Sequence, residues 1–295
     1  MPGRPARTLP GSLIAALAAA IVGVFALDAT TIVAAPAAPA AHATTTTTST
    51  QPGTLGTPNL RILRWSGYNW LVFPPDQAGP ERGIDHGRRF AVTLSDSPKS
   101  AYVDSRGRLH LHIIHTADGW KSVELRLLAP ISYGTFRMVV DSPVAKFSKN
   151  TVLGMFVYQP GSPLHQNEID IEDSQFTTFL GPRYNAQYVV QPYYTQPTAP
   201  HWYKYFIPAK YTPLLQQFTW LPGQASFLTR VGRTTTSPLF TQHHYAGRLV
   251  PVQSADHPLY LYLDLWLNKD LPPTDGTHSV VLHSFRFLPP TPPSR

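Results

Sequence analysis

The chain has 295 residues, no cysteine, 31 prolines and a formal net charge of +7. Because it has no cysteine, it forms no disulfide bonds and carries no lipid on a thiol. The positive charge is spread along the chain and does not form the lysine and arginine clusters of nucleic-acid-binding proteins, so nucleic acid is not an expected partner.

The start of the chain has the features of a secretory signal peptide. Arg4 and Arg7 give a positive beginning, an apolar run follows from Leu13 to Leu27, and residues 41–43 (AHA) form a small-residue cleavage site. The apolar run is shorter than the roughly 20 residues of a membrane span. We therefore expect a secreted, extracellular protein without membrane contact after cleavage. An uncleaved signal that anchors the protein in a membrane is the alternative.

Four regions are predicted along the chain. They are a signal peptide at 1–43, a Thr- and Pro-rich linker at 44–58, a folded domain at 59–288 and a Pro-rich tail at 289–295. In the folded domain most segments alternate between apolar and polar residues at period two, glycines and prolines interrupt them, and no amphipathic helix of useful length is present. This pattern predicts an all-β sandwich or barrel.

Two strand predictions concern the first half of the domain. Residues 121–128 and 134–140 are expected to form an antiparallel pair, since both alternate and only a short connection separates them. Residues 152–158 (VLGMFVY) are predicted to form a buried strand just ahead of the segment that carries most of the chemistry.

That segment, 167–172 (NEIDIE), has a carboxylate at every second position. On a β-strand Glu168, Asp170 and Glu172 share one face, and the isoleucines between them occupy the other. Like charges this close repel each other, which indicates a functional reason for them. Two carboxyl groups that flank one bond are the minimal equipment of glycoside hydrolysis. The same residues are also compatible with an exposed acidic strand face or an oxygen-rich calcium site.

A second informative strand is predicted at 259–268 (LYLYLDLWLN). Its five leucines share one face and are expected in the core. The opposite face carries Tyr260, Tyr262, Asp264, Trp266 and Asn268. Sugars present C–H groups to aromatic rings and hydroxyls to carboxylates and amides, so this face suits a saccharide. The preference of aromatic residues for strands explains the same pattern without a ligand.

The NEIDIE segment resembles the active-site strand of glycoside hydrolase family 16, in its shorter form Glu-x-Asp-x-Glu. The segments 218–223 (FTWLPG) and 263–266 (LDLW) resemble other parts of that family. The resemblance implies a concanavalin-like β-jelly-roll sandwich of two curved antiparallel sheets with a concave substrate groove. It also implies that Glu168 is the nucleophile and Glu172 the general acid/base, while Asp170 holds the nucleophile and modulates both. No cofactor and no metal site are predicted.

The resemblance further implies contacts with the substrate. Trp266 stands where the family has a tryptophan that stacks on a sugar, Asp264 stands where it usually has asparagine, and Gln166 replaces the tryptophan of lichenase-type members. The expected substrate-binding residues are Trp266, Asp264, Tyr194, Gln166 and Tyr262, with Tyr193 and Gln191 as further candidates beside Tyr194.

The sequence thus predicts a secreted, retaining endo-β-glycanase that hydrolyses a β-linked polysaccharide by double displacement. A non-catalytic, lectin-like carbohydrate-binding protein on the same fold is one alternative, and a transglycosylase that uses the same residues is another. The identity of the polysaccharide stays open, because it depends on loops. A monomer is expected, with the oligomeric state left open.

Overall fold

The computed structural model describes residues 60–75, 82–85, 88–91, 93–162, 166–176, 183–193, 200–273 and 275–290, and for 82–85, 88–91 and 270 it describes the backbone alone. All of these residues belong to the unit Gly56–Arg295. The predicted signal peptide 1–43, the linker 44–58, Tyr194 and residues 291–295 of the predicted tail lie outside the described residues.

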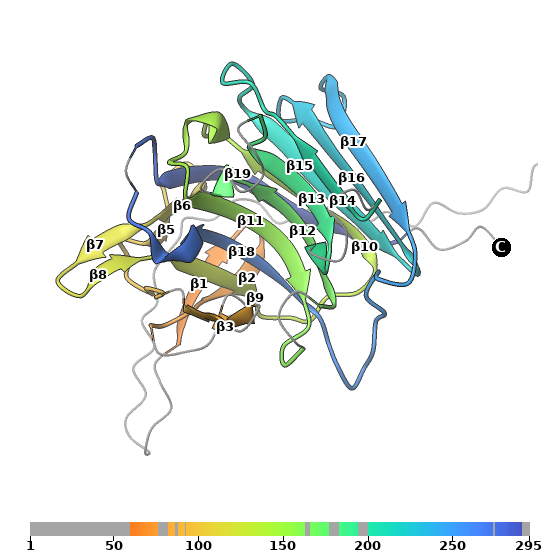
Figure 1. The fold of residues 1–295 in the computed structure, drawn as a ribbon, viewed down its shortest axis with the longest axis horizontal. Helices are drawn as coiled ribbons and strands as arrows, with labels where there is room; N and C mark the ends of the chain where they lie inside the picture. Colours follow the sequence, from red (N-terminus) through yellow and green to blue (C-terminus); the bar gives the residue numbers. More distant parts are fainter. Residues whose placement is uncertain are drawn as a thin grey trace, which may run out of the picture. The chain divides into compact units, whose positions relative to one another are not determined.

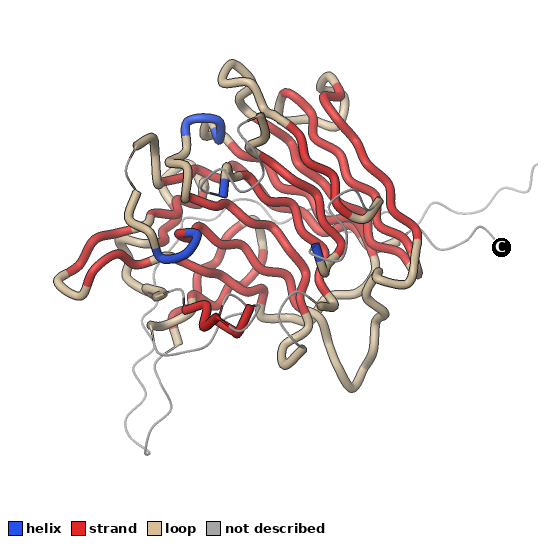
Figure 2. The backbone as a smooth tube through the Cα atoms, in the orientation of Figure 1, coloured by secondary structure: helices blue, strands red, loops and turns tan. Residues whose placement is uncertain are grey.

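Two antiparallel sheets make up most of the described structure (Figure 1; Figure 2). Within the described residues the first sheet has eight strands, in the order β1 (Arg61–Trp65), β2 (Tyr68–Val72), β9 (Val123–Leu127), β18 (Tyr260–Leu267), β11 (Thr151–Tyr158), β12 (Glu168–Asp173), β13 (Ala186–Val190) and β14 (Trp202–Tyr205). The second sheet has seven described strands, in the order β17 (Leu239–Ala246), β16 (Gln224–Val231), β15 (Leu214–Leu221), β10 (Gly134–Val140), β19 (Ser279–Leu288), β6 (Leu109–His112) and β5 (Ala101–Val103).

Smaller elements accompany the two sheets. One hairpin is formed by β3 (Arg82–Asp85) and β4 (Arg88–Ala91), and another by β7 (Ile114–Thr116) and β8 (Gly119–Lys121). The helices that lie wholly within the described residues are the 3-10 turns η1 (Val144–Lys146) and η4 (Asn268–Asp270). None of the helices in this part of the chain has the length and hydrophobicity that a membrane crossing requires. The predicted all-β sandwich of two antiparallel sheets is confirmed.

The core lies between the two sheets, and the alternation at period two decides which residues enter it. Leu261, Leu263 and Leu265 of β18 are fully buried there, as expected for the leucine face of this strand. Phe136 of β10 and Phe218 of β15 reach the same core from the second sheet, with ring centroids 4.8 Å apart. Full burial of each leucine contributes roughly 1.5–3 kcal/mol to folding. The aromatic and polar face of β18 consequently points away from the second sheet.

The predicted pairing of residues 121–128 with 134–140 is wrong. Strand β9 pairs with β2 and β18 in the first sheet, whereas β10 pairs with β15 and β19 in the second. The connection between β9 and β10 therefore passes from one sheet to the other, and Ile131 within it forms an isolated bridge with Leu259. Alternation determines which side chains share a face of a strand, but it carries no information about the neighbouring strand.

The buried leucine face offers a direct test of the core. Leu263 is 0% exposed, and its Cα pairs with those of Met155 and Leu125 on the two flanking strands. We expect Leu263→Ala to lower the free energy of unfolding by about 2–5 kcal/mol, because the cavity closes only in part. Leu239→Ala is the matched control in the edge strand β17, where the side chain is 44% exposed, and it should change stability by less than about 0.5 kcal/mol. Urea denaturation of both variants measures the difference, and equal losses would contradict this placement of the core.

Candidate active site

The three acids of the NEIDIE segment lie on the outer face of the first sheet. Strand β12 buries Ile169 and Ile171 in the core between the sheets, so Glu168, Asp170 and Glu172 project from the opposite face. Glu168 and Asp170 are 5% and 2% exposed, whereas Glu172 keeps a partial exposure at the surface. The acids are therefore outside the core but largely withdrawn from water.

Strand β18 brings three predicted site residues to this face. Tyr262 and Trp266 belong to the apolar cluster on the outer side of the sheet, separate from the core. In the register of the sheet, Asp264 pairs with Gly154 of the intervening strand β11, and Gly154 pairs in turn with Glu172. Asp264 is 1% exposed and Trp266 is 5% exposed. The two informative strands of the sequence thus place their polar and aromatic faces on the same side of one sheet.

Two successive hydrogen bonds, from Trp202 to Gln187 and from Gln187 to Glu172, hold the side chain of Glu172. The side-chain amide of Gln187 donates from Nε2 to Oε2 of Glu172, and its Oε1 accepts a hydrogen bond of 2.7 Å from Nε1 of Trp202. Because an indole nitrogen only donates, Trp202 orients the amide so that its NH₂ group faces Glu172. Burial raises the pKa of Glu172 to about 7, and the hydrogen bond from Gln187 partly offsets that rise.

Asp170 is held in a similar way by Gln191, which directly follows β13. Gln191 donates from Nε2 to Oδ2 of Asp170 at 2.7 Å, while its Oε1 accepts a hydrogen bond of 2.8 Å from the backbone N–H of Tyr193. A backbone N–H only donates, so it too determines the orientation of the amide. Gln191 therefore contacts the central acid, as expected of a site residue, whereas Tyr194 lies outside the described residues.

Strand β9 adds two charged residues that the sequence-based prediction missed. Glu124 pairs with Asp264, and Arg126 pairs with Tyr262, so both side chains lie on the outer face. Glu124 is 1% exposed, and the guanidinium of Arg126 lies 4.6 Å from the ring centroid of Tyr260. Burial raises the pKa of Tyr262, and the charge of Glu124 adds to that rise.

Signals for the missed residues were present in the sequence. Glu124 and Arg126 alternate with three apolar residues in β9. Gln187 in β13 lies four residues before Gln191, and four residues is twice the two-residue period of a strand. Each pattern places the polar residues on the face opposite the core. Nothing local to β9 or β13 indicates that the acids of β12 and β18 are their neighbours.

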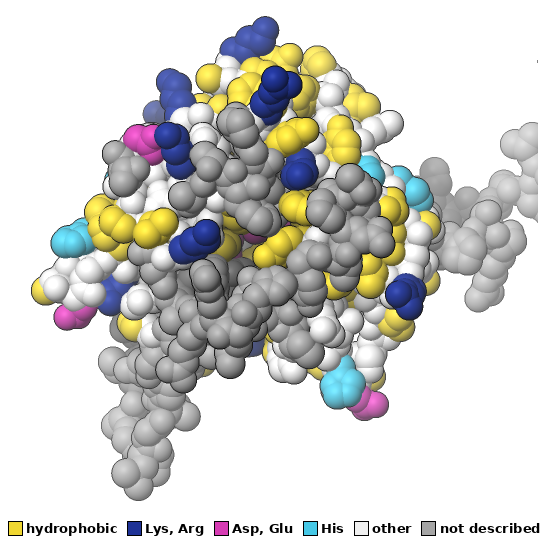
Figure 3. Space-filling model, in the orientation of Figure 1, with side chains coloured by type: hydrophobic (Ala, Val, Ile, Leu, Met, Phe, Trp, Pro, Cys, Tyr) yellow, Lys and Arg dark blue, Asp and Glu magenta, His cyan; other side chains and the backbone are white. Residues whose placement is uncertain are grey.

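The remaining predicted residue, Gln166, lies in the loop before β12. Its side chain is exposed, and its backbone carbonyl accepts a hydrogen bond of 3.2 Å from Oγ of Ser162. In the described part of the chain no group of three or more His, Asp or Glu side chains is placed to hold a metal ion. On the face drawn in Figure 3, lysine and arginine side chains of the described residues lie at several places, and some are close together beside an acidic side chain at the upper left.

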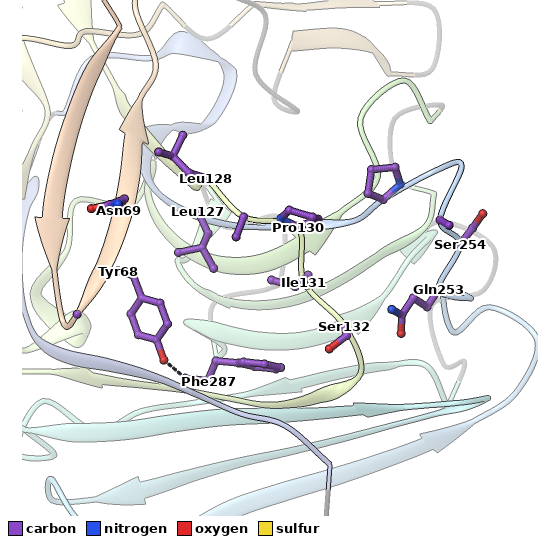
Figure 4. Close-up of a pocket in the computed structure, with 14 residues that line it drawn as sticks. Tyr68, Asn69, Leu127, Leu128, Pro130, Ile131, Ser132, Gln253, Ser254 and Phe287 are labelled. Atoms are coloured by element: carbon purple, nitrogen blue, oxygen red, sulfur yellow. Dashed lines mark hydrogen bonds between the residues drawn. The ribbon is translucent and has the colours of Figure 1, made fainter. Parts of the chain in front are cut away.

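A separate pocket of about 560 Å³ has none of the three acids in its lining (Figure 4). Tyr68, Leu127, Ile131 and Phe287 lie around it, together with Gln253, and the hydroxyl of Tyr68 accepts a hydrogen bond of 3.1 Å from the backbone N–H of Phe287. The described residues that line it include no carboxylate. The carboxyl groups considered as candidates for acid–base chemistry therefore lie on the outer face of the first sheet and not in this pocket.

Comparison with known proteins gives matches in structure alone. No family model matches the sequence, and no curated protein matches it. A glycoside hydrolase family protein from Mycobacterium thermorestibile is 10% identical with a TM-score of 0.52, and the match covers 74% of this chain and 92% of that one. A glycosyl hydrolase family protein from Mycobacterium fortuitum is 12% identical with a TM-score of 0.51, over 74% of this chain and 91% of that one.

A third match is a protein of Mycobacterium tuberculosis described as an immunostimulatory antigen and pseudo β-1,3-glucanase. It is 15% identical with a TM-score of 0.50, and the match covers 75% of this chain and 91% of that one. At identities this low, the structural matches show a shared fold and nothing further. The chain has a β-sandwich fold of two antiparallel sheets like that of these glycosyl hydrolase proteins.

Proposed function

We propose that this protein is a glycoside hydrolase that cuts β-linked polysaccharide within the chain and retains the anomeric configuration. The observation that carries the proposal is the placement of Glu168, Asp170 and Glu172 on one sheet face together with Trp266. Carboxyl groups supply a nucleophile and an acid, and an indole ring offers a flat apolar surface to a sugar. The fold shared with glycosyl hydrolase proteins supports the same proposal.

In the proposed reaction Glu168 attacks the anomeric carbon while Glu172 donates its proton to the glycosidic oxygen. The leaving group departs with that proton, and a glycosyl ester on Glu168 remains. Glu172, now ionised, takes a proton from water, which attacks the same carbon and releases Glu168. A pKa of about 7 at Glu172 supports this assignment, because such a carboxyl is still protonated at mildly acidic pH.

The spacing along β12 determines how the two glutamates act together. Residues four apart on a strand have Cα atoms roughly 13 Å apart, whereas the carboxyl groups of retaining enzymes are about 5–5.5 Å apart. The side chains of Glu168 and Glu172 therefore lean toward Asp170 in the reacting complex. Asp170 lies between the two glutamates and is held by a hydrogen bond from Gln191. In the proposed mechanism it orients the nucleophile Glu168.

A non-catalytic carbohydrate-binding protein is the second candidate, and the burial of the acids favours it. Glu168 is 5% exposed and Asp170 is 2% exposed. A nucleophile has to reach the anomeric carbon of a polymer, which a covered carboxylate does only after neighbouring groups move apart. The proposal of hydrolysis therefore includes an opening of this face when the polysaccharide binds.

Secretion is part of the proposal and is supported by the sequence of residues 1–43. A polysaccharide too large to enter a cell meets the enzyme outside it. Export followed by cleavage after Ala43 is the expected processing, and N-terminal sequencing of the exported protein tests it.

The function is tested by incubating the exported protein with β-1,3-, β-1,4- and mixed-linkage glucans, galactans and xyloglucan. We expect new reducing ends from at least one polymer, with products shorter than the substrate. Binding in affinity electrophoresis without new reducing ends would identify the lectin-like alternative. Products that lengthen as well as shorten would identify a transglycosylase. A protein that neither binds nor cuts any of these polymers would contradict a carbohydrate function.

A further inference from the structure

The pocket drawn in Figure 4 lies where the two sheets meet, beside the connection from β9 to β10. Tyr68 of β2 and Leu127 of β9 reach it from the first sheet, and Phe287 of β19 reaches it from the second. Ile131 lines it from the connection itself. Its volume of about 560 Å³ falls within the roughly 300–1,000 Å³ of small-molecule sites.

The two aromatic rings of the pocket are held in place by the core behind them. Tyr68 packs edge-on against Phe285 with ring centroids 5.3 Å apart, and the ring of Phe287 lies 4.9 Å from that of the core residue Phe136. The hydroxyl oxygen of Tyr68 accepts a hydrogen bond of 3.1 Å from the backbone N–H of Phe287. The O–H of Tyr68 is therefore still able to donate to a ligand.

The loop that closes the pocket on another side is anchored twice. Nε1 of the buried Trp220 donates a hydrogen bond of 2.9 Å to the carbonyl of Pro251, and the backbone N–H of Gln253 donates one of 3.1 Å to the hydroxyl of Tyr133. The rings of Tyr133 and Trp220 pack together with centroids 4.6 Å apart. These contacts hold the polar side chains of Gln253 and Ser254 at the pocket.

The polar side chains of the lining are all neutral hydroxyls and amides. They belong to Tyr68, Asn69, Ser132, Gln253 and Ser254. Oε1 of Gln253 accepts a hydrogen bond of 3.5 Å from the backbone N–H of Tyr133, which turns the NH₂ group of the amide away from that backbone. Among the described residues of the lining there is no Lys, Arg, His, Asp or Glu. A charged ligand would find no opposite charge here, and a buried unpaired charge is costly.

The arrangement of apolar and polar groups matches the chemistry of a sugar. In the view of Figure 4, Tyr68 lies on one side of the pocket and Gln253 and Ser254 lie on the other, with Leu127 and Ile131 between them. The C–H groups of a sugar ring pack on apolar side chains, and its hydroxyls both donate to and accept from amides and hydroxyls. A purely apolar ligand would instead cover these polar groups and leave them without partners.

We propose that this pocket is a second saccharide-binding site, which holds a neutral sugar unit apart from the three acids. The inference goes beyond the proposed function, because binding here requires no hydrolysis and would serve a lectin-like protein equally well. A polymer that contacts both the pocket and the outer face of the first sheet would be held more tightly than by either contact alone.

The test is an NMR titration of the ¹⁵N-labelled protein with cellobiose, laminaribiose and β-1,4-galactobiose. The protein carries Glu168→Gln, so that no sugar is consumed during the measurement. We expect at least one disaccharide to cause saturable shifts of the backbone amides of Gly67, Asn69 and Ser254. Gln253→Ala should weaken this binding by about three- to tenfold, the loss expected for one hydrogen bond to the ligand.

Gln242→Ala is the matched control for this substitution. Gln242 is exposed in β17 and does not line the pocket, and Gln253 is exposed as well, so both variants should keep the fold. The affinity for the disaccharide should stay unchanged in Gln242→Ala. An unchanged affinity in Gln253→Ala would overturn the proposed site.

The position of the shifts separates this inference from the proposed function. Shifts confined to β12 and β18 would restrict sugar binding to the face of the acids and would overturn the second site, while the proposed function would stand. Hexanol serves as an apolar probe, and shifts of the pocket amides by hexanol but by no disaccharide would overturn the saccharide assignment. The absence of any shift would overturn it too, whereas the release of reducing ends by the wild-type protein tests hydrolysis independently.

Discussion

Replacing either terminal acid of the NEIDIE segment by glutamine should abolish hydrolysis, with a loss in kcat of roughly 10³-fold or more. Glu168→Gln removes the group that forms the ester, and Glu172→Gln removes the proton that the leaving group needs. Both side chains project from the outer face of β12, while the isoleucines on its inner face maintain the core. The fold should therefore survive both changes. Release of reducing ends from the preferred polymer, with circular dichroism of each variant, measures the two effects.

Asp118→Asn provides the control for a carboxyl-to-amide change. Asp118 is exposed in the turn between β7 and β8, where its backbone N–H donates to Oγ1 of Thr116. This variant should keep wild-type activity. Substantial activity in Glu168→Gln would rule out Glu168 as the nucleophile. A product of inverted anomeric configuration, detected by NMR during the reaction, would rule out the retaining mechanism as a whole.

The free energy of unfolding is expected to fall as the pH rises from about 4 to about 7, because Asp173 and the adjacent Glu172 both have raised pKa values. Asp173 follows Glu172 on β12 but faces the interior, where it is 1% exposed and accepts hydrogen bonds of 2.9 and 3.0 Å from Nε2 of Gln216. Burial raises the pKa of Asp173 from 3.8 to about 7, the hydrogen bonds from Gln216 partly offset this rise, and the charge of Glu172 adds to it.

The direction follows from proton binding in the two states. Between pH about 4 and 7 the folded protein keeps a proton on Asp173 that the unfolded chain has released, so stability is greatest below this window and is lost across it. Each pH unit in the window weakens folding by about 1.4 kcal/mol. Between pH 5 and pH 8 the wild-type protein should therefore lose roughly 3 kcal/mol more stability than Asp173→Asn, which has no proton to release.

Urea denaturation of the wild-type protein and Asp173→Asn at pH 5 and pH 8 measures this difference. The titrating groups that do not interact with Asp173 are present in both proteins, so their contributions cancel in the comparison, whereas the titration of the adjacent Glu172 changes with the substitution. Identical pH dependence in the two proteins would show that Asp173 titrates normally and would contradict its burial. The Asp173→Asn change should also be tolerated at pH 5, where the natural carboxyl group is protonated and equally neutral.

Alternation along a strand predicts which site residues share a face, but it does not predict which strands are neighbours. Glu168, Asp170 and Glu172 share a face because side chains alternate along any strand, and the same rule groups Tyr262 with Asp264 and Trp266. Residues 121–128 show the limit of the rule. Their alternation correctly separates an apolar face from a polar one, yet β9 pairs with β2 and β18 and not with β10.

The order of residues along the chain was enough to predict the all-β class, the two strands that carry the acids and the aromatic residues, and the face of each strand on which those side chains lie. All of these depend on a period of two residues, which is a local property of the backbone. The order β9, β18, β11, β12 and β13 became known only from the folded chain, and it brings Glu124, Asp264 and Gln187 into one row with Glu172 across Gly154. The burial of Glu168 and Asp170 also became known only from the folded chain. Burial depends on contacts between segments far apart in the chain, and the alternation within a strand does not encode those contacts.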